Sequence, residues 1–193
     1  MSLILREVVL ASGSSARKQI LEQAGVKFSV IVSNVDEDLH PHDEPEKYVT
    51  TLAARKALAV VPRVNKGAIV IAADTICTWR GKIINKPTDE NDARKIIAEA
   101  VAMKLQRVIT GVCVIDTRDM ATFSFAETSV VEMKSATAEE IDAYVKTGEP
   151  MGKAGALAIE SSASFVAKYE GSYANIMGLP IERLLPLLLK LDS

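Results

Sequence analysis

A serine-rich turn follows the first apolar run of the sequence and opens a predicted helix. Residues 8–10 are apolar, and Ser12 and Ser14 come directly after them, with Arg17 one turn further on. Backbone N–H groups at a helix start carry partial positive charge and favour a phosphate, to which these side chains could also donate. The common fingerprints GxGxxG and GxxxxGK[ST] are absent. An ordinary serine-capped helix is therefore the alternative for this segment alone.

Asp74 stands at the end of a continuous apolar run, residues 68–73. Such a run is typical of a central strand that is buried on both faces. Open α/β sheets bind ligands at the carboxyl ends of their strands, so a carboxylate there is well placed to act as a general base. On this residue alone, a turn or helix-capping aspartate is the alternative.

Two lysines lie near these segments. Lys56 belongs to a predicted helix over residues 45–61, and Lys86 precedes Pro87 just after a predicted hairpin. Either could bind phosphate oxygens. Taken singly, each is typical of a solvated surface lysine.

An acidic loop over residues 35–44 contains the candidate metal ligands. Asp36 and Glu37 could hold a hard divalent cation through carboxylate oxygens, although a solvated acidic loop is the alternative. His40 and His42 in the same loop lack a suitably spaced partner pair, so we interpret them as surface residues and not as zinc ligands.

These residues are expected on alternating strands and helices, which predicts an α/β protein with a mixed sheet. Apolar periodicity predicts a first helix that follows Ser15 and ends at Gly25. It predicts further helices over residues 45–61, 89–103, 137–148 and 181–191. Strands are predicted over residues 8–10, 28–32, 68–73, 108–116 and 122–133, with a hairpin over 76–84. Residues 152–178 contain four glycines and are predicted to form loops that pass close to a ligand or another strand.

Composition narrows the class of protein. The 193 residues contain no low-complexity linker, which favours one domain, and the net charge of −2 argues against a general nucleic-acid binder. No run approaches 18 apolar residues, so a membrane span is not expected, and the N-terminus does not read as a secretory signal. Cys77 and Cys113 lie in apolar runs and are expected to be reduced core thiols of a cytoplasmic protein.

Seven short motifs in order, spanning residues 10–181, resemble those of the Maf family of nucleoside triphosphate pyrophosphatases. The opening LASxSPRRxxLL of that family is similar to LASGSSARKQIL at residues 10–21. The family patterns V-D-E, K-A, A-D-T and G-K-P match Val35-Asp36-Glu37, Lys56-Ala57, Ala73-Asp74-Thr75 and Asn85-Lys86-Pro87. The last two motifs match GKAGALAIE at residues 152–160 and GSYANIMGLP at residues 171–180.

The resemblance implies an activity and a fold. The activity is cleavage between the α and β phosphates of non-standard or modified nucleotides, giving a nucleoside monophosphate and pyrophosphate, with Mg²⁺ or Mn²⁺. The fold is an elongated, strongly twisted mixed sheet flanked by helices, related to inosine triphosphate pyrophosphatases. It would form two lobes around a central cleft within residues 1–193, and usually a homodimer.

The resemblance also implies roles for individual residues. Asp74, Glu37, Lys56 and Lys86 would be catalytic, with Asp74 as the base. Asp36 and Glu37 would hold the cation together with the phosphates, and the phosphates would bind Ser12, Ser14 and Arg17.

Three positions bear on the choice of base: Ala16, Thr75 and Glu160. Family members that act on UTP and dTTP carry Arg, Thr and Gln there, and members that act on 7-methyl-GTP carry Trp, Gln and Glu. The chain matches neither set. An ionised Glu160 can only accept hydrogen bonds, which favours guanine-type modified triphosphates over UTP and dTTP.

A second hypothesis is a nucleotide-binding regulator of septation and cell division with little turnover. The presence of Asp74, Lys56, Lys86 and Glu37 together weighs against it, because binding alone needs no base.

Overall fold

A mixed sheet forms the frame of the computed structural model, which describes residues 3–36, 44–157, 159 and 165–193. Within these residues seven strands pair in the order β2-β1-β3-β5-β6-β7, with β4 also paired to β3. The β1–β2 and β1–β3 pairs are parallel, and the other pairs are antiparallel. The strands are β1 (Val8–Leu10), β2 (Ser29–Val30), β3 (Ile69–Trp79), β4 (Lys82–Ile84), β5 (Leu105–Asp116), β6 (Ala121–Met133) and β7 (Val166–Glu170).

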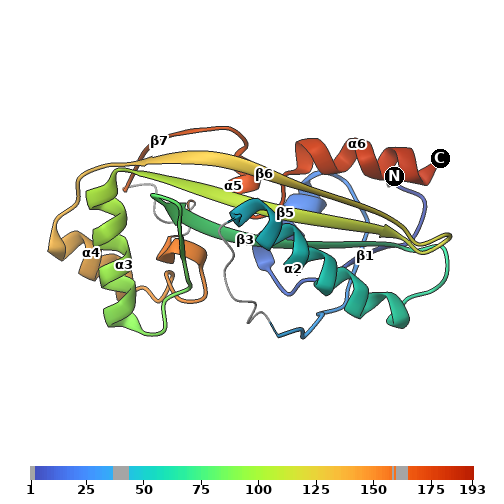
Figure 1. Ribbon diagram of the computed structural model, residues 1–193, viewed down its shortest axis with the longest axis horizontal. Coiled ribbons are helices and arrows are strands. Elements are labelled where there is room, and N and C mark those ends of the chain that lie inside the picture. Colours follow the sequence, from blue (N-terminus) through green and yellow to red (C-terminus); the bar gives the residue numbers. More distant parts are fainter. Residues whose placement is uncertain (1–2, 37–43, 158, 160–164) are drawn as a thin grey trace.

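The helices pack against this sheet along an elongated molecule, with α3 and α4 at one end and both termini at the other (Figure 1). They are α1 (Ser15–Gln23), α2 (Pro45–Val60), α3 (Glu90–Met103), α4 (Ala138–Val145), α5 (Tyr173–Ile176) and α6 (Ile181–Asp192), with 3₁₀ turns over Val61–Arg63 and Ala154–Ala156. In the described part of the chain, no helix has the length and apolarity needed to cross a membrane.

Strand β3 is buried because helices cover both of its faces. Ile69, Ile71 and Ala73 pack in one core cluster with side chains of α1 and α6. Val70 and Ala72 point the other way and pack in a second cluster with side chains of α2. A strand covered on both faces has no solvent side, which explains its continuous apolar sequence.

The prediction that Asp74 ends this strand is wrong. Strand β3 continues through Asp74 to Trp79, so the predicted strand and the first arm of the predicted hairpin form one element. Asp74 is only 7% exposed. The charged Asp74 interrupts the apolar run and therefore indicated the end of the strand. Its charge is paired inside the protein, so the strand continues through it.

The neighbours of β3 change along its length and leave part of one edge open. Strand β1 pairs with β3 as far as Ile71, and β4 pairs with it only from Cys77 onward. On its other edge, β3 pairs with β5 without a break from Ile69 to Thr78. In the described structure, the edge of β3 around Asp74 therefore has no β1 or β4 partner. The opposite edge of the same strand stays hydrogen-bonded to β5.

Most of the other predicted elements are confirmed, including the mixed sheet and the five longer helices. The segment over residues 152–178 is the exception, because it contains β7 and the short helix α5 where only loops were predicted. Cys77 and Cys113 are free, buried thiols as predicted. Burial raises the pKa of Cys77 to about 12 and also raises that of Cys113.

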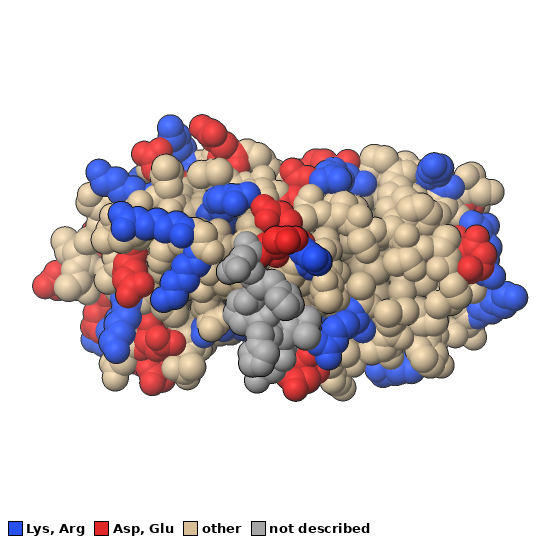
Figure 2. Space-filling view, in the orientation of Figure 1, with Lys and Arg blue, Asp and Glu red and all other residues tan. Residues whose placement is uncertain are grey.

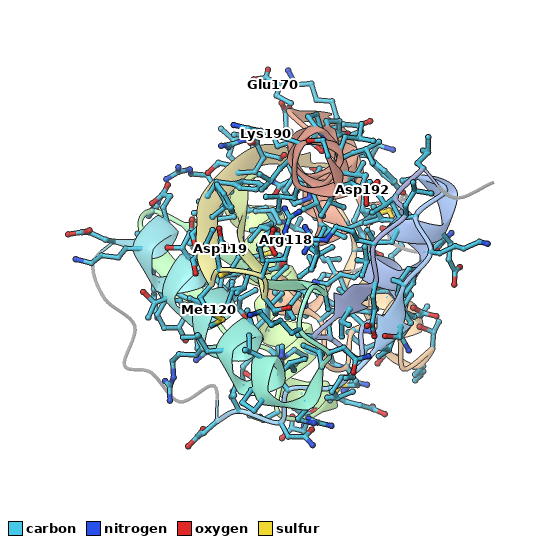
Figure 3. The ribbon with its side chains drawn as sticks, turned by 90° about the vertical axis from the view of Figure 1, so that its right-hand side faces the viewer. Arg118, Asp119, Met120, Glu170, Lys190 and Asp192 are labelled. Atoms are coloured by element: carbon cyan, nitrogen blue, oxygen red, sulfur yellow. The ribbon has the colours of Figure 1, made fainter. Side chains whose placement is uncertain are left out.

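A buried carboxylate organises the end of the molecule where the termini lie. Asp116, at the end of β5, accepts hydrogen bonds from both Arg6 and Arg118. The backbone N–H of Arg6 donates to Asp192 of α6. Figure 3 views this end, where Arg118 lies close to Asp192 and the β5–β6 turn carries Met120. These contacts tie the N-terminal segment, the β5–β6 turn and the last helix together.

Candidate active site

A cavity of about 430 Å³ lies at the open edge of β3. That volume is within the range of small-molecule sites. Its wall is built from the turn before α1 and the start of α1, from residues 32–35, and from side chains of α2, β3, β5, β6 and β7. Lys86 and residues of the segments 152–154 and 176–178, with Leu157 and Ile159, complete it. The cavity therefore collects most of the residues that the sequence singled out.

Lys56 and Asp74 form an ion pair in this cavity. The Nζ atom of Lys56 lies 2.6 Å from Oδ1 of Asp74, and both residues are 7% exposed. An ammonium at this distance stabilises the charged carboxylate against the cost of burial. The interpretation of Lys56 as an ordinary surface lysine is therefore wrong, because α2 turns it inward against β3.

Gly111 of β5 sets the approach of α2 to the sheet. It lies directly opposite Asp74 in the β3–β5 register. A Cβ atom at Gly111 would fall 2.4 Å from the backbone carbon of Val49 in α2, closer than real Cβ contacts. Because α2 carries Lys56, the missing side chain at Gly111 allows the Lys56–Asp74 pair to form. The sequence analysis did not identify Gly111.

The serine-rich turn lies on the cavity wall and is cross-linked by Arg17. Ser14 caps α1 through a hydrogen bond from the backbone N–H of Arg17. The guanidinium of Arg17 donates to Ser12 Oγ at 3.1 Å, to Thr75 Oγ1 at 3.0 Å and to the Gly178 carbonyl at 2.9 Å. Arg17 thus joins the start of α1, strand β3 and the segment before α6, and it brings a positive charge into the wall.

Thr75 connects the cavity to a buried polar network. Its hydroxyl lies 3.0 Å from that of Thr110 in β5, which donates to the Asn175 carbonyl. The Asn175 amide in turn donates to Ser129 Oγ and to the Val108 carbonyl. This chain of hydrogen bonds fixes β3, β5, β6 and α5 relative to one another. It also explains why the last glycine-rich motif of the sequence packs against the cavity.

Lys86 and Lys153 add two further cations to the cavity wall. Lys86 is exposed and Lys153 is half-buried. Lys153 was missed as a site residue, although it lies within one of the motifs noted in the sequence. Together with Lys56 and Arg17, these side chains give the described wall more cationic than anionic groups, which suits an anionic ligand.

The excess of cations on the cavity wall differs from the mixed charge on another face of the molecule. In Figure 2 the visible face over α3 and α4 carries basic and acidic side chains side by side, and neither sign forms a continuous patch there. Net charge alone would not have revealed this concentration of cations, because the whole chain carries only −2.

Of the remaining predicted site residues, some lie at or beside the cavity and others fall outside the described residues. Ala16 lines the cavity beside Arg17. Asp36 is exposed and directly follows Val35, which lines the cavity. Glu37, Glu160, His40 and His42 lie outside the described residues. In the described ranges there is no cluster of three or more His, Cys, Asp or Glu side chains that could hold a metal ion.

Comparisons with known proteins show what the chain is similar to. The family model for "Maf-like protein" matches residues 7–191. A protein from Alkaliphilus metalliredigens named dTTP/UTP pyrophosphatase is 45% identical over 181 residues, which is 93% of each chain. A protein of the same name from Caldicellulosiruptor saccharolyticus is 41% identical over 191 residues, covering 97% of this chain and 96% of that one.

A solved structure also shares the fold. A HAM1 protein from Coxiella burnetii superposes with a TM-score of 0.51 at 13% identity, covering 95% of this chain and 98% of that chain. This likeness confirms the predicted elongated mixed-sheet fold. The extent of the family match and the level of identity to the relatives together establish that the chain belongs to the Maf-like protein family.

Proposed function

We propose that this chain is a nucleoside triphosphate pyrophosphatase that acts on dTTP and UTP. The observation that carries the proposal is the buried Lys56–Asp74 pair on the floor of a cation-lined cavity. A binding protein needs cations around a triphosphate, but it does not need a buried carboxylate among them, since a carboxylate repels phosphate. A hydrolase needs that carboxylate to accept a proton.

The proposed reaction joins a water oxygen to the α-phosphorus and breaks the bond from that phosphorus to the oxygen that bridges to the β-phosphorus. Asp74 accepts the proton that the water loses, and the electron pair of the broken bond leaves with pyrophosphate. Lys56 orients the Asp74 carboxylate through the hydrogen bond from its Nζ atom to Oδ1, at 2.6 Å. Lys86, Lys153 and the start of α1, with Ser12, Ser14 and Arg17, stabilise the negative charge of the phosphates.

We propose that a divalent cation, Mg²⁺ or Mn²⁺, assists this reaction. The residues present fit a hard cation, because the exposed carboxylate of Asp36 directly follows Val35 of the cavity wall and oxygen is the ligand atom that such cations prefer. Mg²⁺ is usually bound by one or two carboxylates together with substrate phosphates. Asp36 and Glu37 would supply those carboxylates. When bound, the cation neutralises charge on the phosphates.

The choice of dTTP and UTP rests on the relatives that carry this name at 41–45% identity. Thr75, which the resemblance links to members acting on UTP and dTTP, lines the cavity and supports the same choice. The preference for guanine-type triphosphates derived from Glu160 stays a prediction, because Glu160 lies outside the described residues.

The test is a substrate panel with Mn²⁺ or Mg²⁺. Pyrophosphate release is measured for dTTP, UTP, CTP, ATP, GTP and 7-methyl-GTP. We expect dTTP and UTP to give the highest kcat/KM. Faster cleavage of 7-methyl-GTP would contradict the proposed base and support the Glu160 argument. Tight binding without turnover of any nucleotide would instead support a nucleotide-binding regulator.

We further propose one domain over residues 1–193, with two lobes around the cavity, in a cytoplasmic homodimer. Separate core clusters pack around α1 with α6 and around α3 with α4, which supports two lobes. Sedimentation equilibrium tests the dimer, and the family resemblance is its support.

A further inference from the structure

Gln106 is a buried amide on the cavity wall that the mechanism above does not use. It is 4% exposed, and it lies in β5 with its side chain lining the cavity. Its Nε2 atom lies 3.0 Å from Sδ of Met133, and within the described residues its Oε1 atom has no hydrogen-bond partner. A thioether is a weak acceptor, so the amide makes one weak hydrogen bond to the residues that the structure describes.

Buried side-chain oxygens without a hydrogen-bond partner are uncommon in folded proteins and call for an explanation. Among the described residues, one other buried side-chain atom lacks a partner, Oδ1 of Asn175. Asn175 does not line the cavity, and its amide nitrogen makes two good hydrogen bonds. Of these two residues, Gln106 is therefore the one that lines the cavity, where a turn of its amide would present the free acceptor to a ligand.

The position of Gln106 separates it from the phosphate-binding groups. Asp74 lies opposite Gly111, and Gln106 lies five residues before Gly111 along β5. The side chains of Gln106, Val108 and Thr110 share one face of the sheet, because side chains alternate along a strand. This part of the cavity also includes Val131 of β6 and Leu157, whose apolar side chains suit the faces of an aromatic ring.

We infer that the Gln106 amide binds the hydrogen-bonding edge of a uracil or thymine base. The amide presents one acceptor and one donor side by side. Uracil and thymine present a ring N3–H donor beside a carbonyl acceptor, which is the complementary pattern. Turning toward the base costs the amide one weak contact with Met133, and the terminal torsion of glutamine is broad. This inference rests on the proposed function and names the residue that reads the base.

The test uses a substrate that lacks the donor. In 3-methyl-UTP a methyl group replaces the hydrogen on N3, and the ribose and phosphates are unchanged. The wild type should cleave UTP with a kcat/KM about tenfold to a hundredfold above that for 3-methyl-UTP, because an unpaired buried acceptor is costly. In Gln106→Met, which keeps the length and removes the amide, this ratio should fall to within about threefold of one, with most of the change in UTP.

A matched control separates base recognition from a general effect on packing. Ser129 is buried on the neighbouring strand β6 and takes part in the polar network, but it does not line the cavity. Ser129→Ala should keep the wild-type ratio of UTP to 3-methyl-UTP. If Gln106→Met lowers both rates equally and leaves the ratio unchanged, Gln106 only supports the fold and the inference is overturned.

Binding of the product monophosphates gives a result that does not depend on turnover. Calorimetry should show that the wild type binds UMP more tightly than 3-methyl-UMP and that Gln106→Met does not distinguish them. If no triphosphate is hydrolysed, the proposed function fails while this comparison still decides the role of Gln106. Equal binding of UMP and 3-methyl-UMP by the wild type, or no binding of UMP, would overturn the inference. Gln106→Asn, which retracts the amide by one methylene, replaces Gln106→Met if that variant does not fold.

Discussion

The Nζ atom of Lys56 and the Oδ1 atom of Asp74 lie 2.6 Å apart, and the two side chains are only 8% and 10% exposed. They come from a helix and a strand that Gly111 allows to approach closely. Breaking a buried ion pair by removing one partner leaves an uncompensated charge. A substitution at either residue can therefore lower activity by destabilising the fold, so each measurement of activity needs a measurement of folding for the same variant.

Asp74→Asn should abolish most turnover while the protein still folds and binds nucleotide. The amide keeps the size and hydrogen bonding of the side chain but cannot act as a base, so kcat should fall roughly 10²- to 10⁴-fold. Pyrophosphate release is the assay, and circular dichroism with calorimetric binding of a nucleotide checks the fold.

Asp116→Asn is the matched control for Asp74→Asn. Asp116 is also a buried carboxylate in an ion pair, but it lies at the other end of the β3–β5 ladder, beside the termini. At neutral pH this variant should keep wild-type kcat per folded molecule. Equal losses in the two variants would mean that Asp74 acts through stability and is not the base.

Lys86→Ala should lower kcat/KM for every triphosphate by a similar factor. A phosphate has no base identity, and a hydrogen bond to a charged group is worth about 10- to 100-fold. Lys82→Ala is the control, because Lys82 is also exposed and lies four residues earlier, at the start of β4, but does not line the cavity. A loss limited to one base would place Lys86 in the base pocket and contradict its proposed role.

Gly111→Ala should destabilise the protein and reduce its activity. The added methyl group would overlap backbone atoms of α2 at 2.4–2.5 Å, which flexible side chains cannot relieve. Overpacking of this kind costs about 1–3 kcal/mol, and the shift of α2 would move Lys56 away from Asp74. Urea unfolding and pyrophosphate release measure the two effects.

For stability, Gly13→Ala is a suitable control. The added carbon there would meet only a side-chain atom of Val32, at an ordinary distance of 3.6 Å. Its unfolding midpoint should stay close to that of the wild type. A Gly111→Ala protein as stable and active as the wild type would show that α2 does not need this close approach.

Asp116 should make stability depend on pH. Hydrogen bonds from Arg6 and Arg118 lower the pKa of Asp116 in the folded protein. A carboxyl group with a lowered folded-state pKa stabilises the fold above its unfolded pKa of about 3.9, and this contribution is lost as the pH falls toward the folded-state value. Asp116→Asn should therefore lower the free energy of unfolding by about 1–3 kcal/mol at pH 7, because a buried charged hydrogen bond is lost.

The difference between wild type and Asp116→Asn should shrink as the pH falls below about 4, because the unfolded wild-type chain then takes up a proton at Asp116 while the folded protein still holds it ionised. Urea unfolding at pH 7, 5, 4 and 3 measures it. A difference that stays constant over this range would mean that the ionised form of Asp116 does not contribute.

Much of the fold follows from local patterns in the sequence. The apolar runs of β3 and β5 and the periodicity of α2, α3 and α6 predicted their own elements, because each packs a continuous face against the sheet. Strand β7 was missed because its residues are mostly exposed and lack a clear alternation. Strand β7 forms because it pairs with β6, which is distant in the sequence, and a local pattern does not predict such a pairing.

The candidate site was predicted in its residue types but not in its geometry. Short motifs indicated Asp74, Lys56, Lys86 and the serine-rich turn, and the cavity brings these together. The motifs could not place Lys56 against Asp74, because that contact depends on the close packing of α2 at Gly111. Gln106 carries no motif, and its significance follows from its burial and its unsatisfied amide.

The identity of the products from dTTP tests the central claim most directly. With Mn²⁺ present, the wild type should convert dTTP to dTMP and pyrophosphate in equal amounts, with no dTDP, and Asp74→Asn should form neither at a comparable rate. Chromatography of the nucleotides together with an assay for pyrophosphate measures both products. Formation of dTDP and inorganic phosphate, or full turnover by Asp74→Asn, would contradict cleavage between the α and β phosphates with Asp74 as the base.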